Sequence, residues 1–309
     1  MISLIVPTRN RCHTLRRVAA SYYRQAAVSE IIFVNDAGTD DSELLFAKLA
    51  RENPNMSTRV ITNAQRLGAA QSRNRGVEAA TNEYVLFCDD DEYLEDGYGA
   101  TCLKKLIQGD LGAVSGRRIY LLDGETPAQG LRRFGTGLRY ARPCNTAICE
   151  YVNGAIFAGD IELPFTNAVI LTRRELLQRY PFDARYCRGN GYREETDYQM
   201  NLYVQGHRIG VTNDCHSFHL PAAQVRTGGQ AAKPLSRIFW SIYYTNYFFG
   251  KYYAAYARKR RLLTPRWGAL AMFAGFAVYR EFLRPVAYPS ALRLSCWWRD
   301  RRAAQLRQG

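Results

Sequence analysis

The sequence predicts an α/β fold in which a Rossmann-like mixed sheet is flanked by helices, followed by a helical C-terminal extension. Four β-branched or aromatic runs recur about every 25 residues in the first third of the chain, as strands joined by crossover helices do. Towards the C-terminus this alternation gives way to aromatic and basic residues. The chain has 309 residues, 47% of them hydrophobic, which is enough for one large domain with its own core.

Four strands are expected in the first third of the chain. Their ranges are 2–7 (ISLIVP), 30–36 (EIIFVND), 58–63 (TRVITN) and 83–89 (EYVLFCD). Because these runs are apolar and closely spaced, we expect buried parallel strands joined by right-handed crossovers. Such crossovers bring the carboxyl ends of all four strands to one edge of the sheet, where open α/β sheets bind ligands.

Helices are expected between the strands. Between the first two, one helix face carries apolar residues at Leu15, Val18, Ala19 and Tyr22, which predicts an amphipathic helix packed on the sheet. Residues 68–80 (GAAQSRNRGVEAA) predict another. Later strands and helices, expected to complete the sheet and build a second wall of the ligand cleft, fall in the ranges 111–124, 166–180 and 194–212.

Three adjacent carboxylates, Asp89, Asp90 and Asp91, directly follow the fourth strand. Carboxylates repel one another when ionised, and their oxygens are the ligands that Mg²⁺ and Mn²⁺ prefer, usually with substrate phosphates completing the shell. In an extended chain end, residues two apart point the same way, so Asp89 and Asp91 are expected to face the cleft together. A solvated acidic turn is the alternative.

Two common classes of nucleotide-binding enzyme fit poorly. No GxGxxG follows the first strand, where the sequence is PTRNRCH, and GxxxxGK[ST] occurs nowhere. A nucleotidyltransferase stays open as an alternative, although the glycine-rich loop with which such enzymes begin is absent.

Five segments, in this order, resemble glycosyltransferase family 2, whose members are inverting enzymes with a GT-A fold. The segments are LIVPTRNR (4–11), VNDAGTDDS (34–42), RLGAAQSRNRG (66–76), YVLFCDDDE (84–92) and REETDYQMNL (193–202). The resemblance spans roughly the first 225 residues. It implies a GT-A catalytic domain at 1–230, with a nucleotide-binding half at about 1–115 and an acceptor half at about 116–230, followed by the extension at 231–309.

The resemblance also implies roles for individual residues at the strand ends. The three acids match the DxD motif, in which Asp89 would lie near the ribose and Asp91 would bind the Mg²⁺ or Mn²⁺ that bridges the donor diphosphate. Asn10 and Arg73 match motif positions too, but each is equally compatible with a helix cap or a surface charge. The residues expected to contact the donor nucleotide are Pro7, Thr8, Arg11, Asp36, Arg66, Asp89 and Asp90.

An inverting transfer requires a base that stands apart from the metal site and deprotonates the acceptor hydroxyl. The position that matches the family's usual base holds Glu195, with Asp197 as its rival. The alternative for these acids is that they favour a helix N-terminus through the macrodipole. A downstream histidine can complete the metal shell in this family, and His219 is favoured over His216. Arg226 lies in a glycine-rich segment expected to close over the diphosphate.

The C-terminal extension is basic and aromatic. Residues 251–309 contain thirteen Lys or Arg and two acids, so eleven of the chain's fourteen net positive charges lie there. The uninterrupted apolar stretch 267–278 is shorter than the roughly 20 residues that span a bilayer. We therefore expect an interfacial segment on an anionic membrane leaflet, with a helical cap packed on the catalytic domain as the alternative. Nucleic acid is not an expected partner, because no motif for binding it occurs.

The resulting expectation is a metal-dependent inverting glycosyltransferase that takes sugar from a nucleoside-diphosphate sugar and adds it to a glycan or polyprenyl-linked acceptor in bacterial surface polysaccharide synthesis. A catalytically silent, membrane-associated sugar-nucleotide or glycan binder is the alternative from another class. The eight cysteines contain no CxxC pair, and the N-terminal apolar run is too short for a signal peptide. Both features favour a cytoplasmic protein, and the basic, aromatic extension adds the expectation that it is peripheral at the inner face of the plasma membrane. The donor base, the sugar, the acceptor linkage and the oligomeric state stay open.

Overall fold

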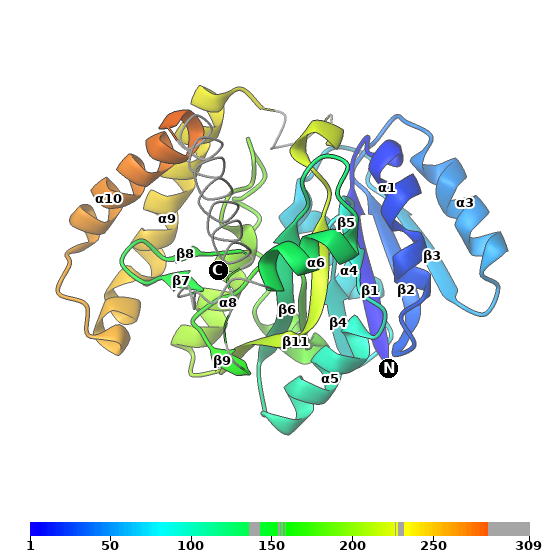
Figure 1. The fold of residues 1–309 in the computed structure, drawn as a ribbon, viewed down its shortest axis with the longest axis horizontal. Coiled ribbons are helices and arrows are strands. Elements are labelled where there is room, and N and C mark those ends of the chain that lie inside the picture. Colours follow the sequence, from blue (N-terminus) through cyan, green and yellow to red (C-terminus); the bar gives the residue numbers. More distant parts are fainter. Residues whose placement is uncertain are drawn as a thin grey trace, which may run out of the picture.

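A nine-stranded mixed sheet forms the centre of the part of the chain that the computed structural model describes, namely residues 1–135, 143–153, 155, 157, 159–225, 227 and 232–283 (Figure 1). The strand order is β3-β2-β1-β4-β10-β6-β11-β5, and β9 pairs with β11 outside this path. The strands are β1 (Ile2–Thr8), β2 (Val28–Asn35), β3 (Ser57–Thr62), β4 (Tyr84–Phe87), β5 (Glu92–Leu94), β6 (Ala113–Tyr120), β9 (Asp160–Glu162), β10 (Ile170–Arg173) and β11 (Ile209–His219).

The first four strands are parallel, as predicted. β1 pairs in parallel with both β2 and β4, and β2 pairs in parallel with β3. The expectation that all four are buried is wrong for β3, where Val60 is 44% exposed. β3 lies at the edge of the sheet and has a neighbouring strand on one side only, so its side chains are less covered than those of β1 or β2.

Helices cover both faces of the sheet. One face packs against α1 (Cys12–Val18), α2 (Ala20–Tyr23), α3 (Ser42–Glu52) and α5 (Tyr98–Gln108), and the other against α4 (Ala69–Ala79), α7 (Arg174–Arg179) and α8 (Glu194–Val204). The predicted apolar helix face is confirmed, since its members are fully buried: Leu15, Val18, Ala19 and Tyr22. The sheet therefore lies between two layers of apolar contacts that fix its strand ends.

The second half of the chain inserts strands beyond β4. β10 runs antiparallel to both β4 and β6, and β5 runs antiparallel to β11. Because β4 and β5 lie apart in the sheet, residues 88–91 must cross its edge to connect them. This connection stretches the acid cluster over the ends of the intervening strands. The short helix α6 (Pro127–Gly135) packs through Leu131 against Ile119 of β6 and Phe218 of β11. The remaining small elements are β7 (Cys144–Asn145), β8 (Glu150–Tyr151) and η1 (Ala222–Gln224).

The described part of the C-terminal extension packs on the domain. It consists of α9 (Pro234–Arg260), α10 (Arg266–Val278) and the short π-helix η3 (Tyr279–Leu283). α9 buries one aromatic face in a core shared with Met200 of α8 and Val211 of β11, through Phe248, Phe249, Tyr252, Tyr253 and Tyr256. Of the described helices, none combines the length and the apolar character that crossing a bilayer requires. The outer faces keep large apolar side chains exposed, including Phe239 and Trp267.

Candidate active site

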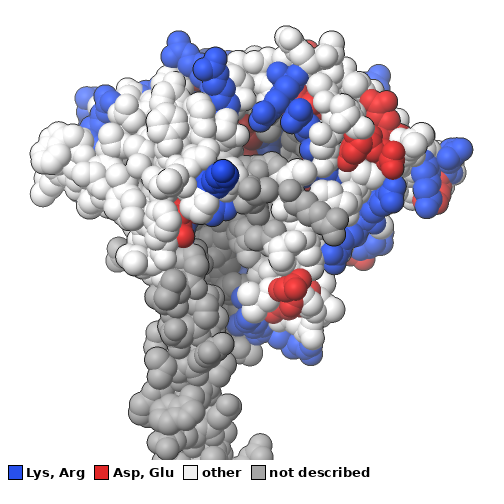
Figure 2. Space-filling model, turned by 90° about the horizontal axis from the view of Figure 1, so that it is seen from above, with Lys and Arg blue, Asp and Glu red and all other residues white. Residues whose placement is uncertain are grey.

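A cavity of about 820 Å³ opens at the carboxyl ends of the parallel strands. Figure 2 views the molecule from above and shows Lys and Arg side chains around a hollow on that face. Of the site residues predicted from the sequence, those that line the cavity are Pro7, Thr8, Arg11, Asp36, Arg66, Asp89, Asp90, Asp91, Glu195 and His219. Asp197 does not belong to this lining.

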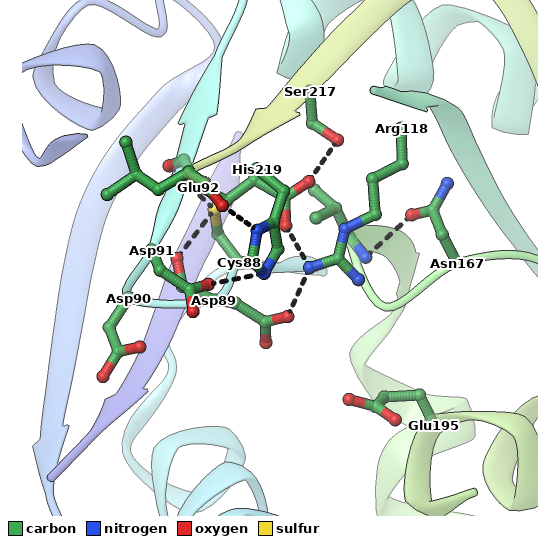
Figure 3. A network of polar contacts seen from close by, with 12 residues as sticks. Cys88, Asp89, Asp90, Asp91, Glu92, Arg118, Asn167, Glu195, Ser217 and His219 are labelled. Atoms are coloured by element: carbon green, nitrogen blue, oxygen red, sulfur yellow. Dashed lines mark hydrogen bonds and ion pairs between the residues drawn. The ribbon is translucent and has the colours of Figure 1, made fainter. Parts of the chain in front are cut away.

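Asp89 is held by two buried arginines. Its Oδ1 accepts a hydrogen bond from Nη2 of Arg73 at 2.9 Å. Its Oδ2 accepts one from Nη2 of Arg118 at 2.9 Å, which Figure 3 shows. Burial alone would raise the pKa of Asp89, but the positive charges of Arg118 and Arg73 outweigh it and lower that pKa. Asp89 is therefore an ionised carboxylate of fixed orientation at the floor of the cavity.

Asp90 and Asp91 share the guanidinium of Arg11. Nη1 of Arg11 lies 2.8 Å from Oδ1 of Asp90 and 2.6 Å from Oδ2 of Asp91. The hydroxyl of Thr8 donates to Oδ2 of Asp90 at 2.6 Å. Burial raises the pKa of Asp90 to about 6 despite Arg11. Every member of the acid cluster thus has a cationic partner from the protein, and the partner of Asp90 and Asp91 reaches them from the loop after β1.

His219 approaches Asp91 from the end of β11. Its Nε2 lies 3.4 Å from Oδ1 of Asp91, while its Nδ1 lies 2.6 Å from the carbonyl oxygen of Leu220. A proton on Nδ1 satisfies that carbonyl and leaves the Nε2 lone pair on the side of Asp91, as in many metal-ligating histidines. Burial lowers the pKa of His219 and keeps the ring neutral. His216, in contrast, pairs with Glu95 at 2.9 Å and lies outside the cavity lining.

The residues present fit a cation bound together with a phosphate ligand. Among the described residues, no group of three or more His, Cys, Asp or Glu side chains is arranged to hold a metal ion. Asp91 and His219 supply one carboxylate oxygen and one imidazole nitrogen. Mg²⁺ and Mn²⁺ are commonly bound through one or two protein groups and substrate phosphates. The donor set thus suits an ion that arrives with a diphosphate.

Asp36 fixes the loop that carries Arg66. Its Oδ1 accepts hydrogen bonds from the Asn63 amide at 2.9 Å and the Leu67 backbone N–H at 2.7 Å, and its Oδ2 accepts one from the Gly68 N–H at 2.9 Å. Gly68 has φ +86°, and a Cβ there would lie 2.9 Å from the Cα of Cys187, so the turn requires glycine. Asp36 organises this wall of the cavity, and the exposed Arg66 projects from it.

Arg73 joins the acid cluster to α8. The sequence left it open as a surface charge, but its side chain is buried and contacts three carboxylates. Its Nη1 binds Glu194, and its Nη2 lies 3.1 Å from Oε1 of Glu195 and 2.9 Å from Asp89. Figure 3 shows Glu195 on α8, apart from Asp91 and His219. Arg73 therefore fixes the position of the acid cluster at Asp89 relative to the glutamates of α8, Glu194 and Glu195.

The two candidate bases have different environments. The Glu195 side chain lines the cavity and is 23% exposed. Asp197 is buried and accepts hydrogen bonds from the Tyr186 hydroxyl at 2.9 Å and from Lys251 Nζ at 2.8 and 2.7 Å. Successive residues on a helix are about 100° apart, so Glu195 and Asp197 face different sides of α8. The geometry gives Asp197 a contact with α9 in place of access to the cavity.

Several cavity residues escaped the sequence analysis. Arg118 was missed because it lies inside an apolar strand pattern, where the signal was the pair of adjacent arginines in GRRIY (116–120). Three others belong to the extension: Arg237, Arg280 and Glu281. Arg226 lies outside the described residues. Next to it, the Thr227 carbonyl accepts a hydrogen bond from Nη2 of Arg11 at 2.8 Å.

Comparisons with known proteins show which family this chain resembles. The family model described as "Glycosyl transferase family 2" matches residues 3–180. Glycosyltransferase GlyA of Streptococcus pneumoniae is 31% identical over 109 residues, covering 35% of this chain and 15% of that protein. The GalNAc(5)-diNAcBac-PP-undecaprenol beta-1,3-glucosyltransferase of Campylobacter jejuni is 30% identical over 109 residues, covering 35% of each chain. The matches thus span well under two thirds of these relatives.

A solved structure extends the likeness beyond the family match. The crystal structure of S. aureus TarS residues 1–349 in complex with UDP-GlcNAc has a TM-score of 0.61 and 16% sequence identity, covering 90% of this chain and 74% of that one. This likeness concerns the fold, and it confirms the predicted GT-A architecture.

Proposed function

Because the chain belongs to glycosyl transferase family 2, we propose that it transfers a sugar from a nucleoside-diphosphate sugar to a hydroxyl of a glycan acceptor in bacterial glycan synthesis. The observation that carries the proposal is the presence of an acid cluster and a separate, accessible carboxylate in one cavity. A cluster suited to a diphosphate and a base that stands apart from it are what a single displacement with inversion requires.

The donor binds across the carboxyl ends of β1, β2 and β4 in this proposal. Asp36 and Arg66 form the wall for the nucleoside, and Asp89 contacts the ribose side. Asp91 and His219 hold Mn²⁺ or Mg²⁺, which when bound would neutralise charge on the leaving diphosphate. An imidazole nitrogen among the ligands favours Mn²⁺, the softer of the two ions.

The positive charge of Arg11 opposes binding of this cation. Its Nη1 lies 2.6 Å from Oδ2 of Asp91, so the guanidinium and a divalent ion compete for the same carboxylate. A bound diphosphate would give the Arg11 guanidinium a further anionic partner, which it could bind through two parallel N–H groups. The positive charge of the cation then offsets the negative charge of the diphosphate when the two bind together. In this proposal, metal binding therefore depends on the nucleotide.

Glu195 is the proposed base. It lines the cavity, and Arg73 orients its carboxylate at 3.1 Å. In the proposed step Glu195 removes the proton of the acceptor hydroxyl, the oxygen forms the new bond to the anomeric carbon, and the nucleoside diphosphate leaves from the opposite face. Asp197, which is hydrogen-bonded to Lys251 and Tyr186, has a structural role in this proposal.

The acceptor is proposed to be linked to a membrane lipid. The Campylobacter relative carries undecaprenol in its name. The exposed faces of the C-terminal helices offer Leu235, Phe239, Tyr243 and Trp267. Apolar and aromatic side chains beside basic residues suit the interface of an anionic membrane. We place the protein at the cytoplasmic face of that membrane.

A matched pair of variants tests the base once a donor is known. Thermal stabilisation by UDP, GDP, CDP and ADP with Mn²⁺ identifies the nucleotide, and the corresponding sugar nucleotides then supply the donor. Glu195→Gln should bind that nucleotide as the wild type does and transfer sugar about 10²- to 10⁴-fold more slowly, the usual contribution of general base catalysis. Asp197→Asn is the control and should keep transfer. The assignment is wrong if Asp197→Asn abolishes transfer and Glu195→Gln does not.

A further inference from the structure

A second group of polar side chains lines the same cavity and takes no part in the proposed donor site. It consists of Glu150, Tyr192, Arg237, Arg280 and Glu281, which we call the extension wall. These residues come from β8, from the loop before α8, from α9 and from η3. Four segments that are distant in the sequence thus meet at one side of the cavity.

The members of the extension wall hold one another in place. The Tyr192 hydroxyl lies 2.8 and 2.7 Å from the two carboxylate oxygens of Glu150. Nη1 of Arg280 lies 3.2 Å from the Tyr192 oxygen, and its Nε lies 3.2 Å from Oε1 of Glu281. Arg237 also pairs with Glu281. Because each side chain has at least one partner in the group, the wall is pre-organised.

Its charge pattern selects a class of ligand. Within the wall, two guanidinium groups alternate with two carboxylates. The buried Arg193 adds a third guanidinium 3.4 Å from Glu150, but its N–H groups are taken up by the Ile148 and Cys149 carbonyls and the Thr245 hydroxyl, so they are not available to a ligand. A phosphate would require a surplus of cationic donors, as Arg-rich phosphate sites have. Hydroxyl groups both donate and accept, so a polyhydroxylated neutral ring matches alternating donors and acceptors better.

The extension wall adjoins the segment that carries the proposed base. Tyr192 precedes α8, which begins at Glu194 and carries Glu195 on the cavity side. Gly191, at φ +57°, makes the turn into this helix. Arg193 fixes the junction, because it donates to the Ile148 carbonyl at 3.0 Å and to Thr245 of α9 at 3.1 Å. A hydroxylated ligand on the wall is thus held next to the segment that would deprotonate it.

We propose that the extension wall is the acceptor subsite and that it binds a neutral sugar residue of the acceptor, not a phosphate group. This proposal rests on the proposed function, since only a transferase needs an acceptor beside its base. It makes α9 and η3 part of the binding site in addition to any contact that they make with a membrane.

The test uses the full chain and neutral probes. Saturation-transfer NMR is recorded with methyl α-D-glucopyranoside, methyl α-D-mannopyranoside and methyl β-D-galactopyranoside, and separately with glycerol 3-phosphate. At least one glycoside should give signals with the wild type. Arg280→Gln and the milder Tyr192→Phe should each weaken them by about tenfold, the effect expected for losing hydrogen bonds that involve charged groups. Arg266→Gln, on the exposed start of α10 and outside the cavity lining, should not.

Three results would overturn the subsite. They are no glycoside signal with the wild type, equal signals in Tyr192→Phe and wild type, and preferential binding of glycerol 3-phosphate that depends on Arg280. Calorimetry of the same samples with nucleoside diphosphates and Mn²⁺ distinguishes failure of the acceptor subsite from failure of the proposed function. Loss of nucleotide binding in the wild type refutes the donor site, whereas intact nucleotide binding without a glycoside effect refutes only the acceptor subsite.

Discussion

Replacing Lys251 by Met should destabilise the protein by about 3 kcal/mol. Nζ of Lys251 lies 2.8 and 2.7 Å from the two oxygens of Asp197, whose side chain is only 4% exposed. Removing one partner of a buried ion pair costs about 3–5 kcal/mol, because the other charge stays buried without compensation. The Lys251 side chain is 27% exposed, which places the expected loss at the lower end. Its second contact, to Asp183, lies closer to solvent and adds little.

The loss should depend on pH in a defined direction. Burial raises the pKa of Asp197 even with Lys251 present, and removing the cation raises it further. A raised folded-state pKa contributes stability below the unfolded value, about 3.9, and that contribution is lost as pH rises through the folded value. The deficit of Lys251→Met relative to wild type should therefore be smallest near pH 4 and grow towards neutrality.

Urea unfolding followed by circular dichroism measures both effects. Lys259→Met is the matched control, since its Nζ binds only the Tyr203 carbonyl and ring among the described contacts and should cost less than about 1 kcal/mol. The double variant Lys251→Met, Asp197→Asn should recover much of the loss, because it removes the buried charge as well. Equal losses in the two lysine variants, with no narrowing at low pH, would refute this account of the contact between α8 and α9.

Two further substitutions test the site and the core. Arg11→Gln should strengthen Mn²⁺ binding in the absence of nucleotide by about tenfold, because it removes a guanidinium 2.6 Å from the carboxylate that binds the ion. Electron paramagnetic resonance titration measures the Mn²⁺ affinity, with the exposed Arg16→Gln as control. Unchanged or weaker Mn²⁺ binding would contradict competition between Arg11 and the ion. Gly189→Ala should cost more than 2 kcal/mol in urea unfolding, since its Cβ would lie 2.3 Å from Cγ of Trp240. Gly124→Ala has a similar positive φ without a clash and should cost about 1 kcal/mol; equal losses would mean that the close packing of the loop against α9 is irrelevant.

The sequence was sufficient to place the strand ends, and with them most of the cavity. Parallel strands and crossovers have a strong periodic signal, so the polar segments after β1, β2 and β4 could be assigned to one edge. The sequence has no comparable signal for which side chains contact one another in the folded protein. Arg73 could be a surface residue by composition, and only the packing of α4 against α8 shows that it binds Glu194 and Glu195.

The C-terminal helices were the least predictable part. An aromatic and basic composition is compatible with a membrane interface and with a packed cap, because both bury apolar side chains and solvate charges. In the structure α9 buries tyrosines such as Tyr252 and Tyr256 against the domain. Its opposite face stays exposed at Phe239 and Tyr243. The packed cap is therefore what the structure shows, and contact of the exposed face with a membrane stays a prediction.

The placement of α9 and η3 beside the cavity has a consequence for synthesis of the chain. Translation delivers β1 to β4 first, and these strands pair with one another, so this end of the sheet can begin to form before the rest of the chain is made. The side formed by Arg237, Arg280 and Glu281 arrives last. In the proposed account, the strands β1, β2 and β4 at the donor site are thus synthesised before the segments of the proposed acceptor subsite.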